Sequence, residues 1–214
     1  MKGNNIFMGK GFFISVEGTD GSGKSTQLGL IREYFKERKI DALFLREPGG
    51  TAISEKIRNI ILDKENDRMA AETEALLYAA SRAQLVKEVI SPAIEAGKNV
   101  VCDRFLDSSI AYQSYGRGLG FDMVFNINSY GVGGLMPDIT LFFDLPPEKG
   151  ILRKAGQQSL DRLELEGDDF RRRVYKGYVE LCERFPTRIK RLDASLSIEE
   201  VFESVKKELS GFLR

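Results

Sequence analysis

The sequence predicts an α/β fold in which a five-stranded parallel sheet lies between two layers of helices. Short apolar runs alternate along the chain with longer segments whose apolar residues recur at helical spacing. Most of the apolar runs lack the regular polar–apolar alternation of a half-exposed strand, which is typical of parallel strands covered on both faces. A chain of 214 residues is the size of one domain, or of one domain with an inserted lid.

The first half of the chain supplies three of the expected strands. The run FFISVE is apolar and short, and a glycine-rich loop follows it. The next segment places Leu28, Ile31 and Phe35 on one helical face. The expected elements are a strand at 12–17, a helix to about residue 39, a strand at 42–46, helices at 53–62 and 73–90, and a strand at 99–103.

The second half of the chain supplies the remaining strands and the lid. Residues 146–167 are charged and poor in apolar side chains, so we expect a lid segment there. The other expected elements are a helix from residue 107 to about 115, a strand at 139–144, a helix at 168–185, a strand at 188–193 and a helix at 198–213.

The composition of the chain argues against several classes of protein and several kinds of site. The formal net charge is zero, so general attraction to nucleic acid is not expected. The chain has no histidine, which excludes imidazole catalysis and histidine-ligated metals. Cys102 and Cys182 match no zinc spacing and are expected to be free thiols. No stretch has the length and apolarity of a membrane span or of a signal peptide, so we expect a cytoplasmic protein.

The loop after the first strand matches the phosphate-binding pattern G-x-x-x-x-G-K-[ST]. The expected ATP-binding residues are Gly18, Thr19, Asp20, Gly21, Ser22, Gly23, Lys24, Ser25 and Thr26. Backbone N–H groups and the helix N-terminus would face the phosphates, Lys24 would reach the outer ones, and Ser25 would ligate Mg²⁺. A glycine-rich turn with an unrelated lysine is the alternative, but the strand and helix on either side favour a P-loop NTPase-type three-layer fold.

Asp103 ends an apolar strand, the usual place of a second Mg²⁺ ligand in such proteins. Asp144 ends a similar strand and is the competing candidate. We favour Asp103 because Arg104 beside it could bind a phosphate. The alternative is that Asp103 only caps a helix.

Several polar residues could form a second binding site. Tyr78 and Arg82 lie one helical turn apart, so a ring could stack on a base while the guanidinium binds its edge. An aromatic residue at this spacing is more often part of the core. Ser109 and Gln113 form a similar pair that could equally be a solvated helix face. Glu47 in a turn and Arg58 on a helix are, taken alone, surface charges.

The lid carries charges near a possible reaction centre. Asp161, Arg162 and Glu164 lie in it, with Arg153 and Lys154 upstream. Such a run is usually a solvated face. However, phosphoryl transfer requires cations around the migrating group, and Lys24 is the only cation in the glycine loop, so a lid cation could complete the site.

Taken together, these segments resemble the thymidylate kinase family from about residue 12 to the closing helix. The glycine loop alone is unspecific, whereas the combination in this order is highly specific. The segments that carry the resemblance are EGTDGSGKST at 17–26, REPGGT at 46–51, LYAASRAQ at 77–84, DRF at 103–105 with DSS at 107–109 and AYQ at 111–113, GRG at 116–118, GGL at 133–135 with PD at 137–138, and DRLE at 161–164.

The resemblance implies transfer of the γ-phosphoryl group of ATP to dTMP with Mg²⁺, in a homodimer. Tyr78 would stack on thymine, with Gln113 and Arg82 near the base edge. Arg58 and Arg104 would hold the dTMP phosphate. The same pocket would include Glu47, Ser108, Ser109 and Asp20, with Asp161 and Glu164 beside the reacting centre. The catalytic residues would be Lys24, Asp20, Arg104 and, because the glycine loop lacks arginine, Arg153 from the lid.

Three departures from the family pattern and two rival functions remain. Tyr78 stands where Phe is common, Ser81 stands where Asp is common, and the lid is sparsely basic, which leaves Lys154 and Arg162 as alternatives to Arg153. Another P-loop nucleotide or nucleoside kinase is the rival within the enzyme class. A GTPase-type switch is the rival outside it, but the chain lacks an N-K-x-D motif.

Overall fold

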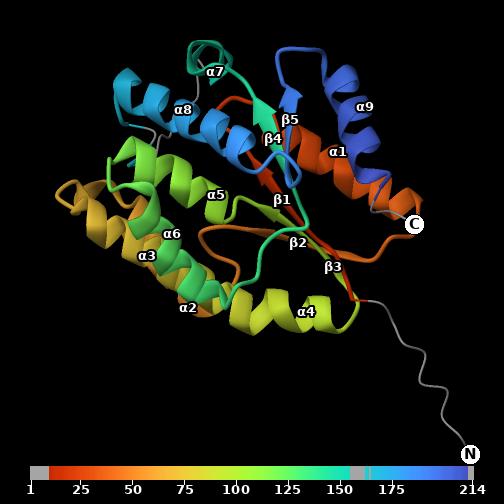
Figure 1. Cartoon of the computed structure of the whole chain (residues 1–214), viewed down its shortest axis with the longest axis horizontal. Coiled ribbons are helices and arrows are strands. Elements are labelled where there is room, and N and C mark those ends of the chain that lie inside the picture. Colours follow the sequence, from red (N-terminus) through yellow and green to blue (C-terminus); the bar gives the residue numbers. More distant parts are fainter. Residues whose placement is uncertain (1–9, 155–161, 164, 212–214) are drawn as a thin grey trace, which may run out of the picture.

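The computed structural model describes residues 10–154, 162–163 and 165–211 of the chain (Figure 1). Within these residues, five parallel strands form one sheet in the order β2-β3-β1-β4-β5, which confirms the predicted sheet. Its strands are β1 (Phe13–Glu17), β2 (Ala42–Arg46), β3 (Asn99–Asp103), β4 (Ile139–Asp144) and β5 (Ile189–Asp193). Because all strands run in one direction, the residues that follow β1, β2 and β3 meet at the same edge of the sheet.

Helices cover both faces of the sheet, as the apolar strands predict. Side chains alternate between the faces, so that Phe13 of β1 packs in one cluster and Ile14 in the other. The first cluster lies under α3, α4, α5, α6 and α8, and the second lies under α1 and α9. The helices are α1 (Lys24–Glu37), α2 (Ala52–Leu62), α3 (Ala71–Leu85), α4 (Ser91–Glu95), α5 (Leu106–Ser109), α6 (Phe121–Val132), α7 (Pro147–Lys154), α8 (Asp168–Arg184) and α9 (Ile198–Leu209).

Local sequence explains several helix boundaries. Thr51 caps α2 by accepting a hydrogen bond from the backbone N–H of Ser54. Ser197 and Glu200 form a capping box at the start of α9. Helix α3 begins at Ala71 and continues through a π-helical segment, Val86–Ile90, into α4, so helical structure extends beyond the predicted end at residue 90.

Helix α6 was not predicted from the sequence. Its buried positions are Val124, Asn128 and Val132, so a polar residue stands in the middle of its inward face and interrupts the apolar period. Another π-helical segment, Ile110–Gly116, continues α5. Helix α7 forms the first part of the expected lid. In the described part of the chain, none of the helices is both long and apolar enough to cross a membrane.

Candidate active site

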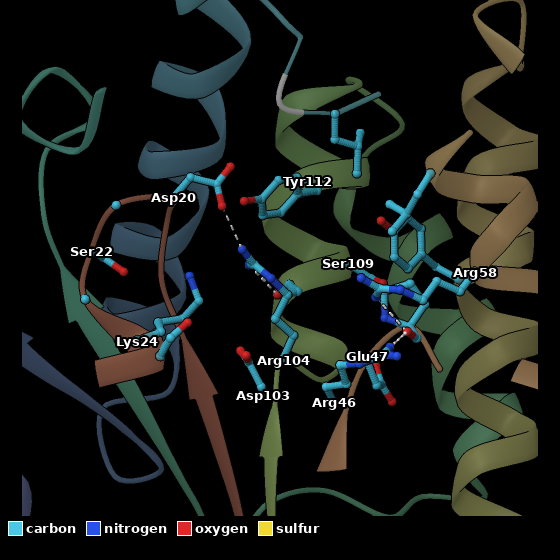
Figure 2. Close-up of a pocket in the computed structure, with 18 of the residues that line it drawn as sticks. Asp20, Ser22, Lys24, Arg46, Glu47, Arg58, Asp103, Arg104, Ser109 and Tyr112 are labelled. Carbon is cyan, nitrogen blue, oxygen red and sulfur yellow. Dashed lines mark hydrogen bonds and ion pairs between the residues drawn. The ribbon is translucent and has the colours of Figure 1, made fainter. Parts of the chain in front are cut away.

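A cavity of about 510 Å³ lies beyond the carboxyl ends of β1, β2 and β3, where parallel α/β sheets bind ligands. Figure 2 shows Lys24 and Arg58 on opposite sides of this region with Arg104 between them. We call the part lined by residues 20–26 the loop end. We call the part lined by Arg58, Tyr78 and Gln113 the helical end, because these residues come from α2, α3 and the π-helical segment after α5.

Most site residues predicted from the sequence line this cavity. They are Asp20, Gly21, Ser22, Gly23, Lys24, Ser25, Thr26, Glu47, Arg58, Tyr78, Asp103, Arg104, Ser108, Ser109, Gln113 and Arg153. Gly18, Thr19 and Arg82 are buried behind its walls. Asp161 and Glu164 lie outside the described residues.

Glycines shape the loop end. Gly21 and Gly23 have φ angles of 74° and 88°, in the left-handed region that favours glycine. A Cβ atom at Gly21 would lie 2.3 Å from the carbonyl oxygen of Gly150, so a side chain does not fit where the loop passes α7. Helix α1 begins directly after Gly23, and its first N–H groups add partial positive charge. The loop end is therefore suited to an anion.

Lys24 is the cation of the loop end. Its Nζ donates to the carbonyl oxygens of Gly18 at 2.8 Å and Thr19 at 3.0 Å. Burial of the ammonium group lowers the pKa of Lys24 to about 8, and the charge of Arg104 acts in the same direction. An anionic ligand would stabilise the charged form, so Lys24 has a strong electrostatic reason to bind one.

Asp103 differs from the competing Asp144 in its surroundings. Both carboxylates have a buried Oδ1 with no hydrogen-bond partner among the described residues, but only Asp103 lines the cavity that contains the glycine loop. Asp144 lies beside a different cavity, and its Oδ2 accepts from Arg191 Nε at 2.7 Å. A carboxylate oxygen without a partner beside a phosphate site fits the oxygen ligands that Mg²⁺ prefers. The geometry therefore favours Asp103 as the candidate ligand.

Arg104 lies where the two ends of the cavity meet. Its Nη2 donates to Asp20 Oδ1 at 3.2 Å, and its Nη1 donates to Gly18 O at 3.1 Å. The guanidinium also lies 5.2 Å from the ring centroid of Tyr112, close enough for a cation–π interaction. Arg104 is thus held against the glycine loop while it lines the space that leads to Arg58.

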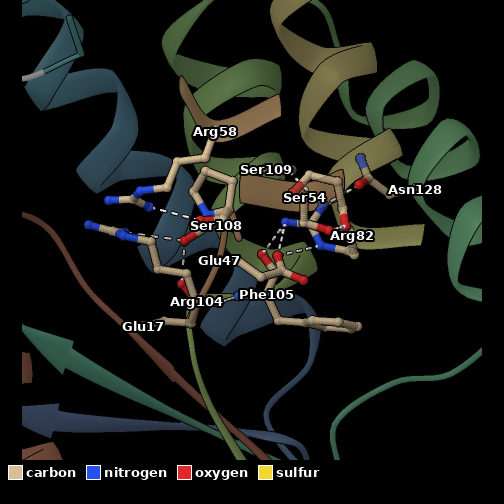
Figure 3. Close-up of polar contacts among 12 residues, drawn as sticks. Glu17, Glu47, Ser54, Arg58, Arg82, Arg104, Phe105, Ser108, Ser109 and Asn128 are labelled. Carbon is tan, nitrogen blue, oxygen red and sulfur yellow. Dashed lines mark hydrogen bonds and ion pairs between the residues drawn. The ribbon is translucent and has the colours of Figure 1, made fainter. Parts of the chain in front are cut away.

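The helical end is supported by a buried charge network (Figure 3). Arg82 is 1% exposed and donates to Glu47 at 2.8 Å, to Ser109 at 2.9 Å, to the carbonyl of Phe105 at 3.0 Å and to Asn128. Burial raises the pKa of Glu47, and Arg82 opposes this shift. Arg82 therefore fixes Glu47 and Ser109 from behind the wall, whereas the sequence predicted a direct contact at a base edge.

Arg58 and Tyr78 form one wall of the helical end. Arg58 Nη1 donates to the carbonyl oxygen of Pro48 at 2.8 Å, and Arg46 donates to the same oxygen at 2.9 Å. Tyr78 is half-buried and lines the same space as Leu62. The wall thus combines a cation with an aromatic ring and an aliphatic side chain, which suits a phosphorylated ligand with a planar ring.

Sequence analysis did not identify Glu74, which organises the helical end from within. Glu74 is fully buried and accepts from Gln113 Nε2 at 2.9 Å, from Arg117 Nη2 at 2.9 Å and from Arg162 Nη2 at 2.6 Å. Burial alone would raise the pKa of Glu74, but the hydrogen bonds from Arg117 and Gln113 hold it below the usual value. Its position one turn before Tyr78 and two turns before Arg82 is the signal that could have revealed it.

The lid arginines occupy different surroundings. Arg153 is exposed, lines the cavity and donates to the carbonyl oxygen of Ala194 at 3.0 Å. Arg162 is 8% exposed and also donates to the carbonyl oxygen of Ile61 at 2.9 Å, in addition to its contact with Glu74. Of these two cations, Arg153 is therefore the one in position to approach a ligand.

Comparison with known proteins identifies the family. The family model described as thymidylate kinase matches residues 16–205. The chain belongs to the thymidylate kinase family. The thymidylate kinase of Clostridium novyi is 49% identical over 209 residues, covering 97% of this chain and 100% of the relative. The thymidylate kinase of Kosmotoga olearia is 50% identical over 196 residues, covering 92% of this chain and 94% of the relative.

A solved structure supports the same family. The crystal structure of thymidylate kinase from Ehrlichia chaffeensis aligns with a TM-score of 0.76 at 30% identity, covering 94% of this chain and 99% of that chain. These similarities confirm the predicted P-loop α/β fold and the predicted enzyme class. As a thymidylate kinase, the chain phosphorylates dTMP with ATP. The rival function as another nucleotide or nucleoside kinase is not favoured.

Proposed function

We propose that the loop end of the cavity binds the phosphates of ATP, that the helical end binds dTMP, and that the γ-phosphoryl group passes between them beside Arg104. One observation carries this proposal: Lys24, Arg104 and Arg58 line a single cavity of about 510 Å³. This volume lies in the range of small-molecule sites, and two phosphorylated substrates must approach within it for direct transfer.

ATP binds residues 18–26 in this proposal. Backbone N–H groups of the loop and the first turn of α1 contact its phosphates, with Lys24 on the outer ones. Ser25 and Asp103, together with the phosphates, would hold Mg²⁺. In the part of the chain that the structure describes, no group of three or more acidic, cysteine or histidine side chains could hold a metal. Shared ligation with substrate phosphates is the usual mode for this ion, which when bound neutralises phosphate charge.

The helical end binds dTMP. Arg58 and Arg104 donate to its phosphate, and Tyr78 stacks on thymine. Asp20 lies between sugar and phosphate, and the remaining contacts come from Glu47, Ser108, Ser109 and Gln113, with Arg82 acting near the base edge. Support comes from the lining of the cavity, because Arg58, Tyr78 and Gln113 line it together with Arg104. Arg104 lies between Arg58 and Lys24 (Figure 2).

The reaction itself requires positioning and positive charge. The phosphate of dTMP is already largely dianionic near pH 7, so its oxygen can attack without a strong general base. This agrees with a chain that has no histidine. Lys24, Arg104 and Arg153 surround the migrating group and stabilise its charge. Asp161 and Glu164 complete the lid side of this centre.

The chain forms one kinase domain, with residues 146–167 as its lid, and works in the cytoplasm as a homodimer. The dimer proposal is supported by exposed apolar side chains on three helices that pack together: Ile53 and Ile60 on α2, Leu76 on α3 and Tyr130 on α6. Tyr130 is 92% exposed, which is unusual for a large aromatic residue outside an interface. Sedimentation analysis at micromolar protein tests this assembly.

A substrate panel tests the proposed function. The purified protein is supplied with ATP and Mg²⁺, and ADP formation is measured with dTMP, dUMP, dAMP, dGMP and thymidine as acceptors. We expect the highest kcat/KM with dTMP. Efficient turnover of a purine nucleotide, or of thymidine in preference to dTMP, would contradict the assignment of the helical end.

A further inference from the structure

The carboxylate of Glu17 is buried beside the active-site cavity without lining it. Glu17 is the last residue of β1. It accepts hydrogen bonds from Phe105 N at 2.7 Å, from Ser108 Oγ at 2.5 Å and from Tyr178 OH at 2.9 Å. Burying a carboxylate is unfavourable unless hydrogen bonds compensate for lost hydration, so a hydrophobic residue here would have been the simpler choice for stability.

The same hydroxyl groups also hold Arg104. Arg104 Nη1 donates to Ser108 Oγ at 3.2 Å and to Tyr178 OH at 3.2 Å, and the two hydroxyl oxygens lie 2.8 Å apart. A hydroxyl has one proton and two lone pairs. An ionised carboxylate only accepts, so Glu17 attracts the hydroxyl protons and leaves oxygen lone pairs facing the guanidinium (Figure 3).

Glu17 also holds the backbone around Arg104. Arg104 has a φ of 71°, a left-handed conformation that is unfavourable for a residue with a side chain. Its N–H donates to Val16 O at 2.9 Å, and the next N–H, that of Phe105, donates to Glu17 Oε1. The end of β1 therefore holds the peptide groups on both sides of the unfavourable Arg104 conformation.

We propose that Glu17 is a positioning residue for Arg104: it holds the backbone turn and orients the hydroxyl groups that direct the guanidinium into the cavity. The inference rests on the proposed role of Arg104 as a ligand of the dTMP phosphate. Glu17 touches no substrate and acts only through Phe105, Ser108 and Tyr178.

The electrostatics of Glu17 agree with a functional role. Burial raises the pKa of Glu17 from 4.5 to about 7, and the charge of Asp107 adds to this shift while Arg104 opposes it. Because the folded protein holds this proton more tightly than the unfolded chain, the contribution of Glu17 to stability is full below pH 4.5 and is lost as pH rises through about 7. At pH 8 the ionised carboxylate therefore lowers stability, and removing its charge should not destabilise the fold.

Glu17→Gln is the direct test, because it keeps the shape of the side chain and replaces one acceptor by a donor. The amide N–H₂ would compel a hydroxyl of Ser108 or Tyr178 to turn its proton towards Arg104. Calorimetry at pH 8 should show that the Kd for dTMP rises about tenfold, the equivalent of one charge-assisted hydrogen bond. The Kd for thymidine, which lacks the phosphate, should be unchanged, and the Tm should not fall.

Two further variants separate positioning from general damage. Tyr178→Phe removes one of the hydroxyl groups and should raise the Kd for dTMP about threefold, with no additional loss when combined with Glu17→Gln, since both act on Arg104 through the same contact. Asp107→Asn is the matched control. Asp107 is also a buried carboxylate, but it pairs with Arg188 at 2.6 Å, so this variant should lower the Tm and leave the preference for dTMP over thymidine unchanged.

The outcomes also separate this inference from the proposed role of Arg104. Normal dTMP binding by Arg104→Ala would overturn that role. If Arg104→Ala loses dTMP affinity but Glu17→Gln stays within about twofold of the unchanged protein, the positioning inference alone is wrong. Equal losses for dTMP and thymidine in Glu17→Gln would also overturn it, because the whole pocket and not the phosphate contact would then have changed.

Discussion

The two ends of the active-site cavity are built in different ways. The loop end consists of consecutive residues, 20–26, whose backbone and the single cation Lys24 face the ligand. The helical end is assembled from residues far apart in the chain. Buried ion pairs support it from behind, such as Arg82 Nη2 with Glu47 Oε2 at 2.6 Å and Arg117 Nη2 with Glu74 Oε2 at 2.9 Å.

This difference follows from what each ligand requires. The phosphates of ATP have negatively charged oxygens on all sides. Backbone N–H groups around them and one lysine are therefore sufficient to bind them. A nucleobase must be told apart from similar rings by the exact placement of a few side chains. These side chains are held in place by contacts on the side that faces away from the ligand. Because those contacts are buried in the core, every polar group in them must have a hydrogen-bond partner. The loop end should therefore control catalysis of transfer, and the helical end should control affinity and selectivity for dTMP.

Removing the cation of the loop end should have the largest effect. Lys24→Ala should lower kcat by about 10²–10³-fold, the scale for losing one preorganised electrostatic contact to a developing charge. Steady-state kinetics with saturating ATP and dTMP measures this loss. Lys36→Ala, on an exposed part of the same helix, is the matched control and should keep full activity. Full activity in Lys24→Ala would contradict the proposal that the ATP phosphates bind at the loop end.

Removing the cation of the helical end should act on affinity and not on the chemical step. Arg58→Ala should raise the Kd for dTMP by about 10–100-fold, since a charge-assisted hydrogen bond contributes about 1.5–3 kcal/mol. The Kd for ATP should not change. Lys56→Ala, an exposed lysine on the same helix, serves as the control in the same calorimetric titrations. A parallel loss of ATP affinity would show that the two ends are not independent.

Replacement of the two lid arginines should affect different properties, kcat for Arg153 and Tm for Arg162. Arg153→Ala should lower kcat about tenfold or more with dTMP binding unchanged, because its contact with the migrating group would form mainly in the transition state. Arg162→Ala should instead lower the Tm, since it leaves the buried Glu74 carboxylate with fewer partners. Kinetics together with thermal denaturation distinguishes the two outcomes. An unchanged kcat in Arg153→Ala would point to another cation.

Selectivity between thymine and uracil should be modest. Thymine differs from uracil by one methyl group, which discriminates by about 1–3 kcal/mol in an apolar pocket. Competition assays should show that dUMP is a poorer substrate than dTMP and still a measurable one. A purine should be rejected more strongly, because the space between Tyr78 and Gln113 would be sized for a single ring. Equal use of dUMP and dTMP would mean that no apolar wall contacts the methyl group.

The same contrast explains what could be predicted from the sequence. The strands and the loop end are local features, so unbroken apolar runs and the glycine pattern predicted them. The inward face of α6 could not be recognised from the sequence, because Asn128 stands there in place of an apolar residue. In the fold, Asn128 accepts a hydrogen bond from Arg82. Spacing along a helix places Arg82 one turn from Tyr78, but it does not show that Glu47, Ser109 and Asn128 enclose the guanidinium. Glu17 and Glu74 are buried through distant contacts, and no local pattern predicts which buried carboxylates organise a site.

A crystal structure of the protein with ADP, Mg²⁺ and dTMP tests the central claim most directly. We expect the ADP phosphates to lie on residues 18–26, with Mg²⁺ near Ser25 and Asp103. The dTMP phosphate should lie between Arg58 and Arg104, and the thymine ring should stack on Tyr78. A dTMP molecule bound with its base towards the loop end, or a phosphate that contacts neither arginine, would contradict it.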